Sequence, residues 1–133
     1  MTTSRRDMIS EYFRRQYDTK EGSTEENVNG LFAEDLVFHL TGDKVMGRDA
    51  LIVLCDLLRR VRHGQATMVS GFEESDDVAS FVLYVVGTDP TTGHEVSVST
   101  KTTYRFVGDK VVEIWQENPA ALEAAVRAAG VRL

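Results

Sequence analysis

The sequence predicts a single α+β domain, in which helices wrap an antiparallel sheet. Apolar residues recur at helical spacing through residues 4–62, whereas from residue 67 onward they fall in strand-like segments separated by short polar turns. A chain of 133 residues is long enough to bury one core and short for two domains, so we expect residues 1–133 to form one domain.

Three helices are expected before the sheet. The first covers residues 4–18, with Ser4 available as its N-cap. A second, short helix starts at Ser23, which together with Glu26 has the spacing of a capping box, and carries apolar residues as far as Phe32. The third covers residues 48–62, where leucines form a wide apolar face.

Five strands and a last helix are also expected. The first strand lies between the second and third helices, and the other four strands and the last helix follow the third. Residues 36–40 are rich in residues that favour strands, and Pro119 fits the first position of a short Ala-rich helix that closes the chain. Short polar connections imply antiparallel neighbours, so the later strands should form a meander. These later strands are expected over residues 67–72, 78–86, 96–106 and 111–117.

Composition and charge exclude several classes of function. A net charge of −6 would repel phosphate backbones and anionic lipids, so neither nucleic acid nor a membrane surface is an expected partner. No apolar run approaches the roughly 20 residues that span a bilayer, and the first residues do not look like a signal peptide, which predicts a soluble, cytoplasmic protein. The lone Cys55 lies among leucines and is expected to be a buried structural thiol.

Three stretches of sequence carry a resemblance to a known family. They are Leu31–His39, Gly47–Leu51 and Thr103–Trp115, in that order along the chain. They resemble segments of the SnoaL-type polyketide cyclases and ketosteroid isomerases, within the nuclear-transport-factor-2-like superfamily. The resemblance implies a cone-shaped fold, a curved antiparallel sheet wrapped by three helices plus a short C-terminal helix, around a pocket for a small hydrophobic molecule.

The alternation of residues along strands predicts which side chains face that pocket. In the last strand Ile114, Gln116 and Asn118 share one face with Val112, and the resemblance makes that face interior. Trp115 then lies on the outer face, which in this family often packs against a second copy, so a homodimer is expected. The expected ligand-binding residues are Tyr17, Phe38, Leu40, Leu54, Leu58, Thr102, Ile114 and Asn118.

Three residues are candidates for a catalytic role. Gln116 is a primary amide on an inward face, which costs free energy unless it is paired with protein or ligand. Tyr104 could orient a ligand or serve only as core, and Asn118 is also explained as the cap of the last helix. His39 is the candidate general acid or base because an imidazole can both donate and accept a proton, although an inward Phe38 would turn it outward.

The positions that hold catalytic carboxylates in the families it resembles hold no carboxylate in this chain. The base position of the ketosteroid isomerases falls on Leu40 and their second acid on Thr102, while the acid/base Asp of the cyclases falls on Asn118 or Pro119. No His, Cys, Asp or Glu pair has ligand spacing, so neither a metal nor another cofactor is expected. We therefore expect a cyclase or isomerase for a polyketide- or steroid-like metabolite that acts by positioning and hydrogen bonding, or else a noncatalytic ligand-binding or dimeric accessory protein.

Overall fold

The computed structural model describes residues 4–60, 65–88 and 91–128 and has helices and strands in the expected order. No described helix is both long and apolar enough to cross a membrane. The elements are α1 (Arg5–Phe13), a π-helical turn η1 (Arg14–Asp18), α2 (Thr24–Leu31), β1 (Phe32–His39), β2 (Val45–Met46), α3 (Arg48–Arg60), β3 (Gln65–Ser75), β4 (Val78–Thr88), β5 (Glu95–Val107), β6 (Lys110–Gln116) and α4 (Pro119–Ala128).

The fold class that the sequence predicts is confirmed, with one change in the sheet. Six strands lie in the order β2-β1-β6-β5-β4-β3, and β3 to β6 form the expected antiparallel meander. The pair formed by β1 and β6, however, is parallel, so the sheet is mixed. Short turns fix the direction of consecutive strands only, and they carry no information about two strands as far apart in sequence as these.

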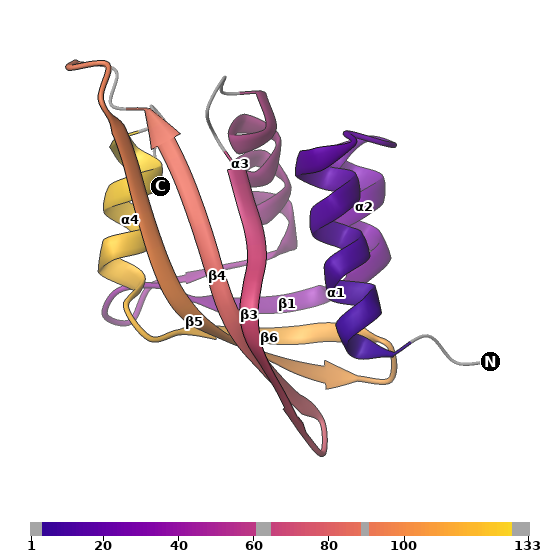
Figure 1. The fold of residues 1–133 in the computed structure, drawn as a ribbon. Helices are drawn as coiled ribbons and strands as arrows, with labels where there is room; N and C mark the ends of the chain where they lie inside the picture. Colours follow the sequence, from indigo (N-terminus) through magenta and orange to yellow (C-terminus); the bar gives the residue numbers. More distant parts are fainter. Residues whose placement is uncertain (1–3, 61–64, 89–90, 129–133) are drawn as a thin grey trace.

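The sheet bends so strongly that its strands enclose the helices. Figure 1 shows β3, β4 and β5 rising beside α3, while β6 and β1 run across their lower ends. Helices α1, α2 and α3 lie inside this bend, and α4 packs against β4 and β5. The concave face of the sheet and the inner faces of the helices therefore bound one continuous apolar interior.

The predicted helix starts are confirmed by their caps. The Ser4 hydroxyl accepts a hydrogen bond from the backbone N–H of Asp7 at 3.1 Å, and that of Ser23 accepts one from Glu26 at 3.1 Å. The second helix ends at Leu31. Phe32 therefore belongs to β1, whereas the sequence had predicted it to lie in the helix. The third helix ends at Arg60 in the described part of the chain, and residues 61 and 62 of its predicted range lie outside the described residues.

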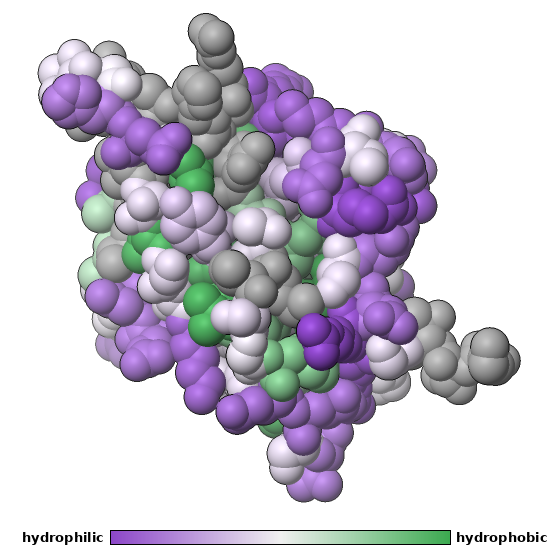
Figure 2. All heavy atoms as spheres, viewed as in Figure 1, coloured by the Kyte–Doolittle hydropathy of each residue, from purple (hydrophilic) through white to green (hydrophobic). Residues whose placement is uncertain are grey.

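The core is organised by alternation along residues 79–85 of β4 and by aromatic contacts. Ala79, Phe81, Leu83 and Val85 are buried, whereas the residues between them are partly exposed. The ring of Phe81 meets that of Tyr104 edge to face, with centroids 5.0 Å apart. Figure 2 shows apolar residues gathered in the middle of one face of the molecule and polar residues over most of its edges.

A buried amide ties the three enclosed helices to one another. Gln16 of η1 is fully buried, and its amide nitrogen donates to the Thr24 hydroxyl at 3.0 Å and to the Cys55 carbonyl at 3.2 Å. Its amide oxygen accepts from the Asn27 side chain at 3.0 Å. Because η1, α2 and α3 each contribute a partner, this network fixes how the helices sit over the sheet.

Candidate functional site

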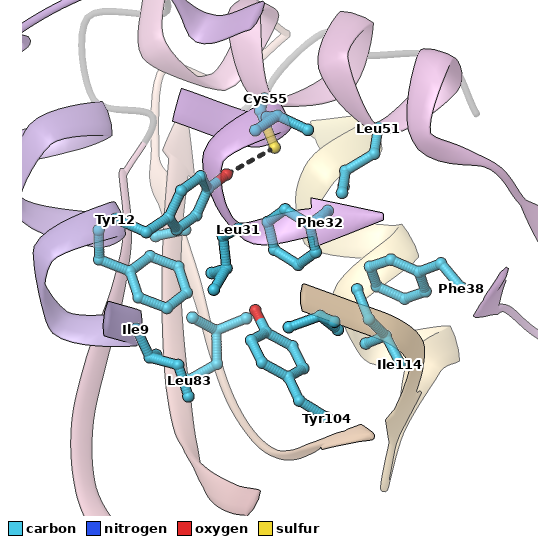
Figure 3. Close-up of a cluster of buried hydrophobic side chains, with 14 of the residues drawn as sticks. Ile9, Tyr12, Leu31, Phe32, Phe38, Leu51, Cys55, Leu83, Tyr104 and Ile114 are labelled. Atoms are coloured by element: carbon cyan, nitrogen blue, oxygen red, sulfur yellow. Dashed lines mark hydrogen bonds between the residues drawn. The ribbon is translucent and has the colours of Figure 1, made fainter. Parts of the chain in front are cut away.

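A small cavity lies between the helices and the concave face of the sheet. Its volume is about 60 Å³, and apolar side chains from α1, η1, α3 and all the longer strands line it. Figure 3 shows the surrounding cluster, in which Tyr12 and Phe32 approach from one side and Leu83, Tyr104 and Ile114 from the other. We call this space the inner cavity.

The hydroxyl and thiol groups of the inner cavity are neutral at physiological pH. The Tyr12 hydroxyl donates to the Cys55 sulfur at 3.3 Å, the contact drawn as a dashed line in Figure 3. Burial raises the pKa of the Cys55 thiol above its usual range and raises the pKa values of Tyr12 and Tyr17 well above theirs. A thiol that stays protonated is a poor nucleophile, which agrees with the structural role expected of Cys55.

Tyr104 presents a hydrogen-bond donor to this apolar space. Its ring packs edge to face against Phe32 and Phe81, and Figure 3 shows its hydroxyl pointing towards the centre of the cluster. Burial, and then the neighbouring Cys55, raise the pKa of Tyr104 above its usual value, so the hydroxyl keeps its proton. A neutral Tyr hydroxyl in a dry site can donate to a carbonyl or enolate oxygen.

Among the described residues that line the cavity, Gln116 alone has a fully buried polar atom without a hydrogen-bond partner. Its amide nitrogen lies 3.5 Å from the Thr102 hydroxyl, which is at the limit for a hydrogen bond. Its amide oxygen is buried and has no partner. Thr102 and Gln116 face each other across β5 and β6, so the pair brings two polar groups to one point of the cavity wall.

Comparisons with known proteins identify the family. The family model of the SnoaL-like domain matches residues 8–114, which run from within α1 to within β6. This chain belongs to the SnoaL-like domain family. The comparison with curated proteins gave no significant match.

Several solved structures share the fold across almost the whole chain. IdmH from Streptomyces antibioticus, a candidate polyketide cyclase, is 17% identical, with a TM-score of 0.68 over 97% of this chain and 100% of its own. TsrD from Streptomyces laurentii is 12% identical, with a TM-score of 0.69 over 96% and 98%. A candidate SnoaL-like polyketide cyclase from Jannaschia sp. CCS1 is 13% identical, with a TM-score of 0.67 over 95% and 97%. At these identities the likeness establishes the fold and no activity.

Most of the predicted site residues of this SnoaL-like chain line the inner cavity together. Their positions follow from the strand alternation and from the inner faces of η1 and α3, which the sequence pattern located. The residues that the cavity brings together are Tyr17, Phe38, Leu54, Leu58, Thr102, Tyr104, Ile114 and Gln116.

His39 lies on the opposite face of the sheet and cannot reach the inner cavity. Its ring stacks on Trp115 with centroids 5.4 Å apart, and its Nε2 atom is 2.6 Å from a carboxylate oxygen of Glu113. Arg105 donates to the other oxygen of Glu113 at 3.1 Å. The hydrogen bond from His39, and then that from Arg105, hold the pKa of Glu113 below its usual range. The strand register therefore places His39 outside the lining of the inner cavity.

Two more predicted ligand-binding residues lie away from the inner cavity. Asn118 is exposed and directly precedes α4, which is the N-cap position of that helix in the sequence. Leu40 follows the end of β1 and lines a separate hollow. Val112 is also displaced from the predicted inward set, because a bulge between β5 and β6 turns Val111 inward and makes Val112 the extra residue.

The sequence reasoning missed several members of the cavity wall. Phe32 was assigned to a helix, and Leu51 and Cys55 were assigned to the core alone, although the apolar face of α3 was the signal that placed them together. The first helix was expected to contribute Phe13, Tyr17 or both, and both line the cavity. The remaining members that the sequence did not assign to the site are Tyr12, Ala66, Leu83 and Val85. Within the described residues, no group of His, Cys, Asp or Glu could hold a metal ion.

A second hollow, larger than the first, opens beside the inner cavity. Its volume is about 550 Å³, and residues of β2, α3 and α4 line it together with Leu40 and Lys44. Leu54 lines both spaces, so the two are neighbours. Glu123 of α4 lines the second hollow and is 7% exposed, and nothing in the sequence pattern singled it out. We call this space the outer hollow.

Proposed function

We propose that this SnoaL-like protein binds a small hydrophobic metabolite of the polyketide or steroid class and acts on it as a cyclase or isomerase. The observation that supports the proposal is the unpaired amide oxygen of Gln116 beside Thr102, in a cavity whose other walls are mostly apolar. A buried polar group without a partner is costly, and a ligand that donates to it would recover that cost. Tyr104 would supply a donor to the same ligand.

Catalysis in such a cavity would come from positioning and hydrogen bonding. The lining of the inner cavity has no Asp, Glu, Lys or Arg among the described residues, and its Tyr and Cys groups are neutral. A folded substrate held against apolar walls has already lost the freedom that opposes ring closure. A hydrogen bond from Tyr104 to a developing oxyanion would lower the barrier further, and one such donor is commonly worth 10²- to 10³-fold in rate.

The size of the inner cavity supports the alternative proposal of a noncatalytic ligand-binding or accessory protein. Its volume of about 60 Å³ is less than half of the roughly 150 Å³ that an engineered cavity needs to hold benzene. A polyketide- or steroid-like ligand would therefore require the lining helices to move, or Leu54 to turn aside and join the two spaces. An interior that stayed closed would favour the noncatalytic protein.

We also propose that the protein forms a homodimer through the outer face of its sheet. Trp115 is 37% exposed there and forms a flat surface with His39, which stacks on it. An exposed aromatic residue flanked by the charged pair of Glu113 and Arg105 is typical of an interface core with a polar rim. A cytoplasmic location stays a prediction from the sequence.

Calorimetric titration with two ligands tests the proposed function. The ligands are progesterone, a steroid enone, and emodin, an anthraquinone of polyketide origin. Binding of either one should weaken about five- to tenfold in Tyr104→Phe, the loss of one hydrogen bond in a dry site. Tyr84→Phe is the matched control, because Tyr84 lies on β4 between the inward residues Leu83 and Val85.

The outcomes separate the two proposed functions. Binding that Tyr104→Phe weakens, together with a new product detected by mass spectrometry after incubation, would support the enzyme. Binding with no product from these ligands or from simpler linear polyketides would favour the noncatalytic protein. Binding that is equal in Tyr104→Phe and Tyr84→Phe would remove the inner cavity from the proposal.

A further inference from the structure

The outer hollow has the dimensions of a small-molecule site in its own right. Its volume of about 550 Å³ falls within the range of roughly 300–1,000 Å³ that is usual for ligand pockets, whereas the inner cavity falls well below that range. Three separate elements, β2, α3 and α4, form its walls. The sequence pattern gave no indication of it, because two of these walls come from a two-residue strand and the last helix.

Apolar side chains are left in contact with solvent on the walls of this hollow. Val45 of β2 and Val53 of α3 are each 60% exposed, and both line it. They are two of the four strongly exposed large hydrophobic residues in the described part of the chain, the others being Val107 and Trp115. Exposed apolar surface that is concave and backed by Leu54 offers a hydrocarbon chain a place to be buried.

The charged residues of the hollow leave an excess of positive charge at one edge. Lys44 and Arg127 both line it, and both stabilise the carboxylate of Glu123. That carboxylate is already engaged, because one oxygen accepts from the Thr41 N–H at 3.1 Å and the other from the Thr41 hydroxyl at 2.7 Å. Lys44 and Arg127 therefore lie near one carboxylate, that of Glu123, whose two oxygens already accept hydrogen bonds from Thr41.

We propose that the outer hollow binds an elongated apolar carboxylic acid, with its carboxylate at the edge formed by Lys44 and Arg127 and its hydrocarbon chain along Val45, Val53 and Leu54. The carboxylate would supply the second negative charge that the edge lacks. The chain would cover the exposed valines. This site does not depend on the function proposed for the inner cavity, although Leu54 makes the two spaces neighbours.

Titration with three ten-carbon ligands that differ in their end group tests this proposal. Decanoate should bind more tightly than decanol, and decanol more tightly than decylammonium, because only the first complements the positive edge. Hexanoate should bind more weakly than decanoate by about fourfold for each methylene that the hollow buries. Equal binding of decanoate and decylammonium would overturn the proposal.

Variants locate the carboxylate and the hydrocarbon chain separately. Lys44→Gln and Arg127→Gln should each weaken decanoate binding about two- to fivefold and leave decanol binding unchanged. Lys101→Gln is the matched control, because this exposed lysine lies beside Trp115 and away from the outer hollow. Val53→Gln should weaken decanoate and decanol alike, since it removes apolar surface and no charge.

Two further results would overturn the proposal. One is the same loss of decanoate binding in Lys101→Gln as in Lys44→Gln, which would show an effect of net charge alone. The other is a loss of decanoate binding in Tyr104→Phe, which would place the ligand in the inner cavity. If progesterone and emodin fail to bind while decanoate binds as described, the function proposed for the inner cavity fails and the outer site stands.

Discussion

Replacing Gln116 by Leu is expected to stabilise the ligand-free protein. The substitution removes a buried amide oxygen that has no partner, and a buried unsatisfied acceptor costs about 1–3 kcal/mol. It also removes the hydrogen bond to Thr102, which at 3.5 Å is worth about 0.5 kcal/mol or less. The net gain is about 1 kcal/mol. With roughly 2.1 cal/mol/K of unfolding entropy for each of the 133 residues, that gain raises Tm by about 3–4 °C.

The same substitution at Gln16 should have the opposite effect. Gln16 is also buried, but both ends of its amide are paired, through Thr24, Cys55 and Asn27. Gln16→Leu leaves the donor of Asn27 and the carbonyl of Cys55 without these partners, at a cost of about 2–4 kcal/mol. The expected fall in Tm is about 7–14 °C. The same Gln→Leu substitution thus changes the stability in opposite directions at the two sites, because both ends of the Gln16 amide are paired and the Gln116 oxygen is not.

Thermal and urea unfolding, followed by circular dichroism, measure both changes. The m-values of the two variants should match that of the wild type, so that the shifts report stability and not a change in the unfolded state. A loss of stability of more than about 1 kcal/mol in Gln116→Leu would refute the reasoning, because it would show that the amide oxygen is paired. A gain of stability together with weaker binding of progesterone or emodin would show that Gln116 serves the ligand.

Three other perturbations test separate parts of the structure. Glu123→Gln should destabilise the protein by about 1–2 kcal/mol, because the charged acceptor that holds Thr41 is lost, and urea unfolding would measure it. Hydrogen bonds from Thr41 lower the pKa of Glu123 in the folded state. The stability that the carboxylate contributes is therefore present above the unfolded pKa of about 4.3 and is lost as the pH falls through the folded pKa. Over that acidic window the wild type should lose more stability than Glu123→Gln. Leu54→Ala should cost about 2–5 kcal/mol in unfolding, measured with urea, and should weaken decanoate binding because it removes part of the apolar wall of the outer hollow. Trp115→Glu should convert a dimer to a monomer by sedimentation, and a variant that stays dimeric would contradict the proposed interface.

The sequence predicted those parts of the fold in which a local rule acts alone. Alternation along β4 placed Phe81 and Leu83 inside, and the serine caps placed the starts of α1 and α2. These rules need only neighbouring residues, because the side-chain period of a strand and the hydrogen bond of a cap are local. The same reasoning brought Tyr104 and Gln116 to one cavity, since both lie on strands with a clear alternation.

The rest could not be predicted because it depends on contacts between distant segments. The bulge at Val112 exists only in the pairing of β5 with β6, and it changes which of two adjacent valines is buried. The early start of β1 at Phe32 depends on its parallel pairing with Val111 of β6. Glu123 belongs to a helix whose own pattern is unremarkable, and only its approach to the loop at Thr41 makes it a buried carboxylate.

The position of the unsatisfied group argues for a ligand in the inner cavity. The fully buried amide of Gln16 is paired at both ends by protein groups, whereas the buried amide oxygens of Asn29 and Gln116 have no partner in the described structure; of these two, Gln116 lines the inner cavity. At position 116 a leucine would face the same cavity without leaving a buried acceptor unpaired, and so at lower free energy. A residue that lowers stability without a compensating contact within the protein is typical of a functional site. The compensating contact is then expected from a bound molecule that offers a donor to the amide oxygen.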